Sequence, residues 1–94
     1  MLKSELEYII EEEFKLDKVL GKKVINTLIE SMIGALKDDD RIEIRGFGSF
    51  FPKTYDSYRG RNPKTGEAIA VPEKILPIFR PSKDLIAKLN KKKD

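Results

Sequence analysis

The sequence predicts an α+β domain in which two amphipathic helices precede an antiparallel sheet and a short final helix. Three observations indicate this class. Apolar residues recur with helical spacing over residues 6–36, and the pattern changes to strict alternation over residues 41–45. Residues 53–74 are mostly polar around a turn with proline and glycine, which is typical of a β-ribbon that projects from a core as an arm. The 94 residues are the length of one domain.

The acidic first half is expected to form the two helices. Ser4 and Glu7 have the spacing of a capping box at the start of the first helix. Asp17 has the chemistry of an N-cap for the second helix. Gly21 is expected to interrupt that helix near its start, because glycine is a poor helix former. The three aspartates at 38–40 are expected to end it as a solvated turn.

The second helix carries an apolar stripe that is broad for a chain of this length. The stripe consists of Leu20, Val24, Ile25, Leu28, Ile29, Met32, Ile33 and Leu36. A domain this short buries a modest fraction of its surface, and the absence of cysteine excludes disulfides as a remedy. The stripe therefore predicts core packing, and a dimer seam in addition.

The second half is expected to form the sheet and the arm. Residues 41–45 alternate as a half-buried strand does, residues 46–48 form a tight turn, and residues 49–51 restart a strand. Residues 68–71 return from the arm as a strand, and Pro72 interrupts it.

The end of the chain is expected to return to the core and finish as a helix. Residues 75–79 have core-like spacing, and Pro81 and Ser82 open a short helix. One side of that helix carries Leu85, Ile86 and Leu89. Residues 91–94 form a solvated basic tail.

Composition narrows the possible functions. Histidine and cysteine are absent, so an enzyme would depend on carboxylates, lysines or hydroxyls, and a structural zinc site is not expected. No catalytic residue, metal or cofactor is predicted. No segment reaches the roughly 18 apolar residues of a membrane span, and the start of the chain is acidic rather than apolar. A cytoplasmic protein that does not enter the membrane is therefore expected.

Charge is divided unevenly along the chain. Residues 1–40 carry 6 basic and 10 acidic side chains, a net charge of −4, and residues 41–94 carry 13 basic and 6 acidic ones, a net charge of +7. These values sum to the +3 of the whole chain. A basic half on a nearly neutral chain indicates a patch directed at a polyanion such as nucleic acid, although an unevenly charged solvated surface has the same composition.

Three motifs in the second half resemble one known family. The motifs are GFGSF at 46–50, GRNPKTGE at 60–67 and PIFRPSK at 77–83. In this order and spacing they are similar to the bacterial HU/IHF family of histone-like DNA-binding proteins. The resemblance spans the chain in element order and implies an intertwined dimer whose two β-arms enter the minor groove of duplex DNA and bend it.

The resemblance also implies which residues contact DNA. Pro63 corresponds to the proline at the arm tip that intercalates between base pairs, although a turn-forming role alone would also suit it. The positions implied to contact DNA around it on the arm are Lys53, Arg59, Arg61, Asn62 and Lys64. On the body, Lys3 and Lys83 correspond to phosphate contacts at the starts of the first and last helices.

The strand at 41–45 resembles the beta subunit of integration host factor. There the positions of Glu43 and Arg45 belong to a site-selective minor-groove contact, whereas an exposed strand pair would have the same sequence. The partner subunit is accordingly a second copy, as in HU homodimers, or a homologue, as in integration host factor.

The sequence as a whole predicts one DNA-binding domain over residues 1–94. Residues 1–40 form its helical dimerisation part, and residues 41–94 contain the sheet, the arm at about 53–74 and the final helix. The expected function is to bend duplex DNA and organise the nucleoid. A dimerisation module that binds a protein partner is the alternative.

Overall fold

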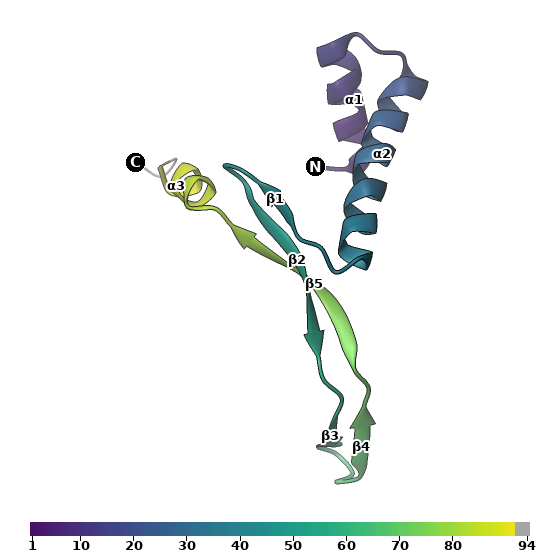
Figure 1. Ribbon diagram of the computed structural model, residues 1–94, viewed down its shortest axis with the longest axis vertical. Coiled ribbons are helices and arrows are strands. Elements are labelled where there is room, and N and C mark those ends of the chain that lie inside the picture. The colour runs from purple at the N-terminus through teal and green to yellow at the C-terminus, as the bar shows by residue number, and fades with distance from the viewer. Residues whose placement is uncertain (92–94) are drawn as a thin grey trace. The chain divides into compact units, whose positions relative to one another are not determined.

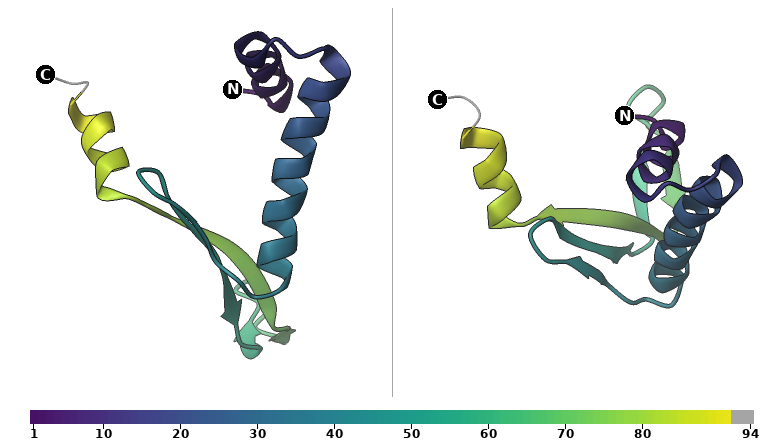
Figure 2. Two further views of the ribbon diagram at one scale, coloured as in Figure 1. Left: turned by 45° about the horizontal axis from the view of Figure 1, so that its top comes forward. Right: turned by 90° about the horizontal axis from the view of Figure 1, so that it is seen from above.

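The computed structural model describes residues 1–91, which form three helices and five strands (Figures 1 and 2). In chain order these are α1 Lys3–Phe14, α2 Lys18–Lys37, β1 Ile42–Ile44, β2 Gly48–Tyr55, β3 Tyr58–Arg61, β4 Ala68–Val71, β5 Lys74–Pro81 and α3 Lys83–Lys91. The predicted α+β order is confirmed. Residues 92–94 of the expected basic tail lie outside the described residues. Within the part described, no helix is both long and apolar enough to span a membrane.

The chain divides into two compact units, residues 1–38 and residues 39–94. The first consists of α1 and α2, which pack against each other. The capping box expected at Ser4 and Glu7 is wrong, because α1 begins at Lys3 with Leu2 as its N-cap, two residues before Ser4. Glu5 accepts a hydrogen bond from the Leu2 amide at 3.2 Å instead. Glu7 is buried and forms an ion pair with Lys3 at 3.4 Å.

The start of α2 follows the sequence prediction at one position and departs from it at another. The Asp17 carboxylate accepts a hydrogen bond from the Leu20 amide at 2.8 Å, which confirms the N-cap. The helix continues through Gly21 without interruption. Gly21 is buried, and a Cβ there would overlap the side chain of Glu11, so this glycine lets α1 and α2 approach closely.

The apolar stripe of α2 is mostly exposed in the single chain. Ile25 is 4% exposed and is the one buried hydrophobic residue among those described. Its stripe neighbours Leu28 and Ile33 are 55% and 49% exposed. A single chain therefore leaves most of this surface in contact with water.

The second unit contains a three-stranded antiparallel sheet in the order β1-β2-β5. β1 and β2 are joined by a turn in which Gly46 adopts a φ of +85°, a conformation that glycine favours. Gly48 begins β2 directly beside β5: a Cβ on it would lie 2.5 Å from the Arg80 carbonyl oxygen and 2.7 Å from the Phe79 ring. The rings of Phe47, Phe50 and Phe79 cluster here, with centroids 4.7 to 6.4 Å apart.

A β-ribbon extends from the long pair of strands β2 and β5 to the smaller pair β3 and β4 (Figure 1). This is the predicted arm. Tyr55 pairs with Lys74 at the end of the first ribbon, and Tyr58 pairs with Val71 at the start of the second, so the register is the same on both sides of the break. Residues 56–57 and 72–73 form the break, which confirms the interruption expected at Pro72.

Helix α3 begins where the sequence predicts. The Ser82 hydroxyl accepts a hydrogen bond from the Leu85 amide at 3.0 Å and caps the first turn. The Ser82 amide donates to the Phe47 carbonyl oxygen at 2.9 Å, which fixes the start of α3 to the turn between β1 and β2.

Candidate nucleic-acid interface

The tip of the arm is a short loop closed by hydrogen bonds within itself. Asn62 is its centre: its amide donates to the Glu67 carbonyl oxygen at 2.9 Å, and its carbonyl accepts from the Gly66 amide at 2.8 Å. Its side-chain oxygen accepts from the Lys64 amide at 2.9 Å. Gly66 has a φ of +74°, which a side chain would disfavour. The loop is therefore closed by hydrogen bonds of both the backbone and the side chain of Asn62.

Pro63 lies in this loop and is exposed to solvent. Its ring has a fixed φ, and it has no amide hydrogen that would lose a partner when buried. The hydrogen bonds of Asn62 on one side and Gly66 on the other hold the peptide that carries it. The arrangement presents a rigid apolar group at the end of the ribbon.

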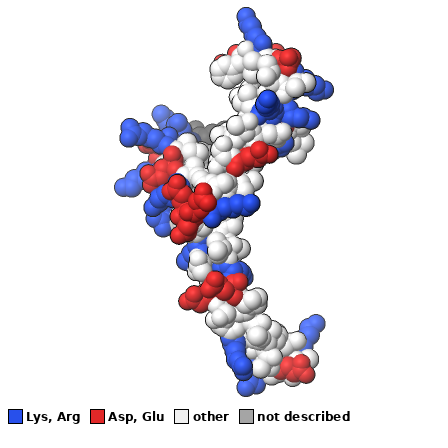
Figure 3. Space-filling model, turned by 45° about the vertical axis from the view of Figure 1, so that its right-hand side comes forward, with Lys and Arg blue, Asp and Glu red and all other residues white. Residues whose placement is uncertain are grey.

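The cationic side chains predicted for the arm lie along the ribbon and its tip. Arg61 is the last paired residue of β3, and its guanidinium donates to the Gly66 carbonyl oxygen at 3.3 Å. Arg59 on β3 and Lys64 in the tip loop are exposed. Lys53 lies on β2, with its ammonium 5.3 Å from the centre of the Tyr55 ring. Figure 3 shows Lys and Arg side chains at the end formed by β3 and β4, with acidic surface beside them.

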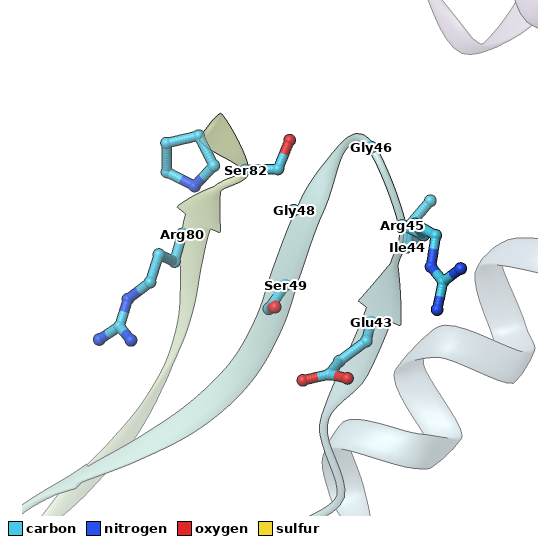
Figure 4. A pocket seen from close by; sticks show the side chains of 9 residues that line it. Glu43, Ile44, Arg45, Gly46, Gly48, Ser49, Arg80 and Ser82 are labelled. Atoms are coloured by element: carbon cyan, nitrogen blue, oxygen red, sulfur yellow. The ribbon is translucent and has the colours of Figure 1, made fainter. Parts of the chain in front are cut away.

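A second group of predicted residues lies near the start of α3. Glu43 and Arg45 line an open hollow of about 440 Å³, together with Arg80 and Ser82 (Figure 4). Lys83 is the exposed first residue of α3 and follows the capping serine. The structure thus brings Glu43 and Arg45 to the same hollow as Ser82, the residue that precedes Lys83, whereas Lys83 itself does not line it. Free amides at a helix start and nearby arginines suit an anion.

Lys3 belongs to the helical unit and is engaged within it. Its ammonium pairs with the buried Glu7 at 3.4 Å, and its side chain remains 51% exposed. The ion pair neutralises part of its charge in the single chain, so Lys3 is a weaker candidate for a phosphate contact than Lys83.

Sequence reasoning missed two arginines and an aromatic residue on the sheet. Arg41 and Arg80 both lie against the ring of Phe51, with guanidinium carbons 5.6 and 5.4 Å from its centre. Two signals in the sequence point to Arg41 and Phe51. Arg41 shares the alternation of Glu43 and Arg45, and Phe51 follows Phe50 directly, so these two phenylalanines face opposite sides of the sheet. Within residues 1–91, no three histidine, cysteine or acidic side chains are grouped as metal ligands.

Comparisons with known proteins agree with this geometry. The family model described as bacterial DNA-binding protein matches residues 1–90. The chain is 48% identical over 88 residues to the integration host factor subunit beta of Xylella fastidiosa strain 9a5c, covering 90% of this chain and 83% of that one.

Solved structures give the same result. The chain is similar to the HU of Anabaena in a cocrystal with DNA, with 31% identity, a TM-score of 0.80 and coverage of 95% of this chain and 97% of that chain. It is also similar to the HU of Thermotoga maritima, with 25% identity, a TM-score of 0.62 and coverage of 95% and 98%.

Proposed function

The chain belongs to the family of bacterial DNA-binding proteins that includes HU and the integration host factor subunits, and from this premise we propose that it binds double-stranded DNA as a two-armed dimer and bends it. The role is architectural: it organises the bacterial nucleoid and involves no catalytic step. The similarity to an HU that was solved together with DNA supports the choice of ligand.

The partner in the proposed dimer is a second copy of the chain. The exposed stripe of α2 supports association with a partner subunit, because Leu28, Ile29 and Ile33 are 36% to 55% exposed in a chain with one buried hydrophobic side chain among its described residues. Burying a Leu or Ile side chain contributes about 1.5–3 kcal/mol to stability, so burying two such stripes against each other strongly favours dimerisation. The mass of the purified chain in solution distinguishes a homodimer from a monomer that awaits a homologous subunit.

The arms of the dimer would enter the minor groove, and Pro63 would intercalate at the tip. The observation that carries this proposal is the exposed ring of Pro63 on a loop closed by three hydrogen bonds of Asn62. A flexible tip would change its conformation when inserted between base pairs, whereas a closed loop keeps the proline ring in position. Arg59, Arg61 and Lys64 would then lie beside the phosphates or the groove floor.

The body would provide contacts on either side of the bend. Lys83 and the amides at the start of α3 suit a phosphate. Lys3 would contact a second phosphate once its ammonium exchanges the ion pair with Glu7 for that phosphate. Glu43 and Arg45 would read the groove beside the bend, which is the source of the sequence preference that we propose. The 48% identity to an integration host factor beta subunit supports selectivity at this strand.

The test of the wedge compares intact duplex with duplex that carries a nick. Bending a 20–30 bp site costs on the order of 1–6 kcal/mol, and a nick removes part of that cost. Pro63→Ala is expected to weaken binding to intact duplex on the order of tenfold, to weaken binding to nicked duplex less, and to reduce the bend measured by fluorescence transfer between the DNA ends.

The matched control for this test is Gly66→Ala. It strains the tip loop, because Gly66 has a φ of +74°, but it leaves the proline ring in place. A loosened tip is expected to weaken binding to both duplexes equally. If Pro63→Ala loses the same affinity for intact and for nicked duplex, Pro63 has a turn-forming role only. If a dimeric chain binds no duplex at low salt, the alternative of a module that binds a protein partner replaces the proposed function.

A further inference from the structure

The outer face of the sheet, opposite the phenylalanine cluster, carries an ordered set of charged and aromatic side chains. Successive residues of a strand point to opposite faces, so Phe50 faces the cluster with Phe79, and Phe51 faces the other side. Ser49 pairs with Glu43 on one side and with Arg80 on the other, so these three residues form one row across the sheet (Figure 4).

Phe51 occupies the centre of the next row. Phe51 pairs with Ile78 on β5. On the other side of β2, Arg41 directly precedes β1. The Arg80 guanidinium reaches diagonally from the first row to the Phe51 ring at 5.4 Å, and the Arg41 guanidinium lies 5.6 Å from the same ring. Both distances are within the range of cation–π contacts.

The two guanidinium groups keep donors available for an anion. Glu43 accepts from the Nε of Arg41 at 3.3 Å, which leaves the two terminal nitrogens of that arginine. Arg80 has no ion-pair partner within residues 1–91, and it is exposed. Lys53 and Lys74 continue the same face toward the arm, so this face has four cationic side chains against the one carboxylate of Glu43.

We propose that Phe51 is a positioning residue of the DNA interface, whose ring holds Arg41 and Arg80 on the outer sheet face so that each contacts a backbone phosphate of the bound duplex. The proposal rests on the proposed function and extends its interface to three residues that the arm and the helix starts do not include. The occupant is the duplex backbone because the face is cationic, and because Lys53 connects it to the arm. The ring reduces the side-chain entropy that two free arginines would lose on binding.

The first experiment measures binding of a linear duplex as a function of salt. Arg41→Gln/Arg80→Gln is expected to lower the slope of log affinity against log salt by about two units per chain, and by about four in a dimer. Lys22→Gln/Lys23→Gln removes the same charge from exposed positions on α2 and is the matched control. A slope that falls no further than in this control would overturn the proposal.

The second experiment separates positioning from charge and from folding. Phe51→Leu keeps every charge and is expected to weaken binding about two- to fivefold per site, whereas Phe51→Tyr keeps a ring and is expected to bind as the parent chain does. In the Arg41→Gln/Arg80→Gln background, Phe51→Leu is expected to have no further effect. An equal loss in both backgrounds would assign Phe51 a structural role and contradict the proposal, whatever the thermal midpoint of the variant.

The same titrations include Arg61→Gln on the arm, which separates this proposal from the proposed function. If the parent chain binds no duplex, the proposed function fails and this inference with it. If the parent chain binds and Arg61→Gln weakens it, but the Phe51 and arginine variants match their controls, only the role of the outer sheet face is overturned.

Discussion

At the scale of single residues, two glycines have positions that a larger side chain could not occupy. Gly21 lies at the contact of α1 and α2 against Glu11, and Gly48 lies against Arg80 and Phe79. Both are structural requirements of a close approach. From the sequence, Gly21 is expected to be a weak point of its helix. The structure assigns it the opposite role, because the neighbour that needs the space is on another helix.

Gly48→Ala is expected to destabilise the fold by about 2 kcal/mol or more. The new Cβ would lie 2.5 Å from a backbone oxygen that β5 cannot move without breaking its register. Thermal unfolding at fixed protein concentration measures the effect. Gly34→Ala is the control: no atom lies within 4 Å of its added Cβ, and an alanine inside a helix stabilises by about 0.5–1 kcal/mol. An unchanged midpoint in Gly48→Ala would contradict the close packing of β2 on β5.

The two N-caps show what sequence reasoning can reach at this scale. Asp17 and Ser82 each precede a helix and were identifiable because capping depends on residues three positions apart. The cap of α1 is not fixed by the sequence, since the same acidic segment offers Glu5 as the partner of Leu2 and Glu7 as the partner of Ser4, in two frames that are two residues apart. Alternation and the adjacent phenylalanines mark Arg41 and Phe51 in the sequence, whereas the contact of Arg80 with the same ring depends on strand pairing and is not predictable from the sequence.

At the scale of elements, the arm consists of two ribbons in one continuous register, separated by a break of two residues on each strand. If the register is continued through the break, Asp56 comes opposite Glu73, and Ser57 comes opposite Pro72. Like charges directly opposite each other disfavour pairing, and proline has no amide hydrogen to donate. These two features explain why the ladder stops here and resumes without an insertion.

Pro72→Val is expected to extend the ladder across the break. Valine restores a donor and favours strands, and the register already aligns position 72 with Ser57. Hydrogen exchange of the Ser57 amide is expected to slow by about two- to tenfold, because a hydrogen bond donated by the new amide at position 72 would hold the two strands together across the break. Ile69→Val, which changes β4 without changing its donors, is the control. Exchange that is as fast in Pro72→Val as in the parent chain would place the cause in the carboxylates alone.

The stripe of α2 leads to a second prediction for an element. Leu28→Glu puts a charge on the stripe and is expected to convert the proposed dimer into monomer and to cost about 3 kcal/mol or more per chain in stability. Lys23→Glu is the control. It changes the charge two residues from Ile25, on the side of α2 opposite that residue. Sedimentation equilibrium of both variants measures the mass. A Leu28→Glu chain that keeps the mass of a dimer would exclude the stripe from the interface.

At the scale of the whole molecule, the order of elements was predictable because helical and alternating patterns are local properties of the sequence. The two units at 1–38 and 39–94 follow the change of pattern and of charge near residue 40. The extent of burial was not predictable, since it depends on which surfaces meet. Among the described residues, 22 large hydrophobic side chains are exposed and one hydrophobic side chain is buried, so the chain is expected to be stable only with a partner.

This imbalance predicts that folding and association are one process. If two chains unfold together, dilution by a factor of one hundred lowers the stability of the dimer by about 2.7 kcal/mol through mass action. The unfolding entropy is about 2.1 cal/mol/K per residue for two chains of 94 residues. Dividing the loss of stability by this entropy gives a fall of about 7 °C in the thermal midpoint. Scanning calorimetry and circular dichroism at the two concentrations measure the shift. A midpoint that is independent of concentration, in a sample with the mass of a monomer throughout, would mean that the stripe of α2 is covered within the chain and that the arms do not act in pairs.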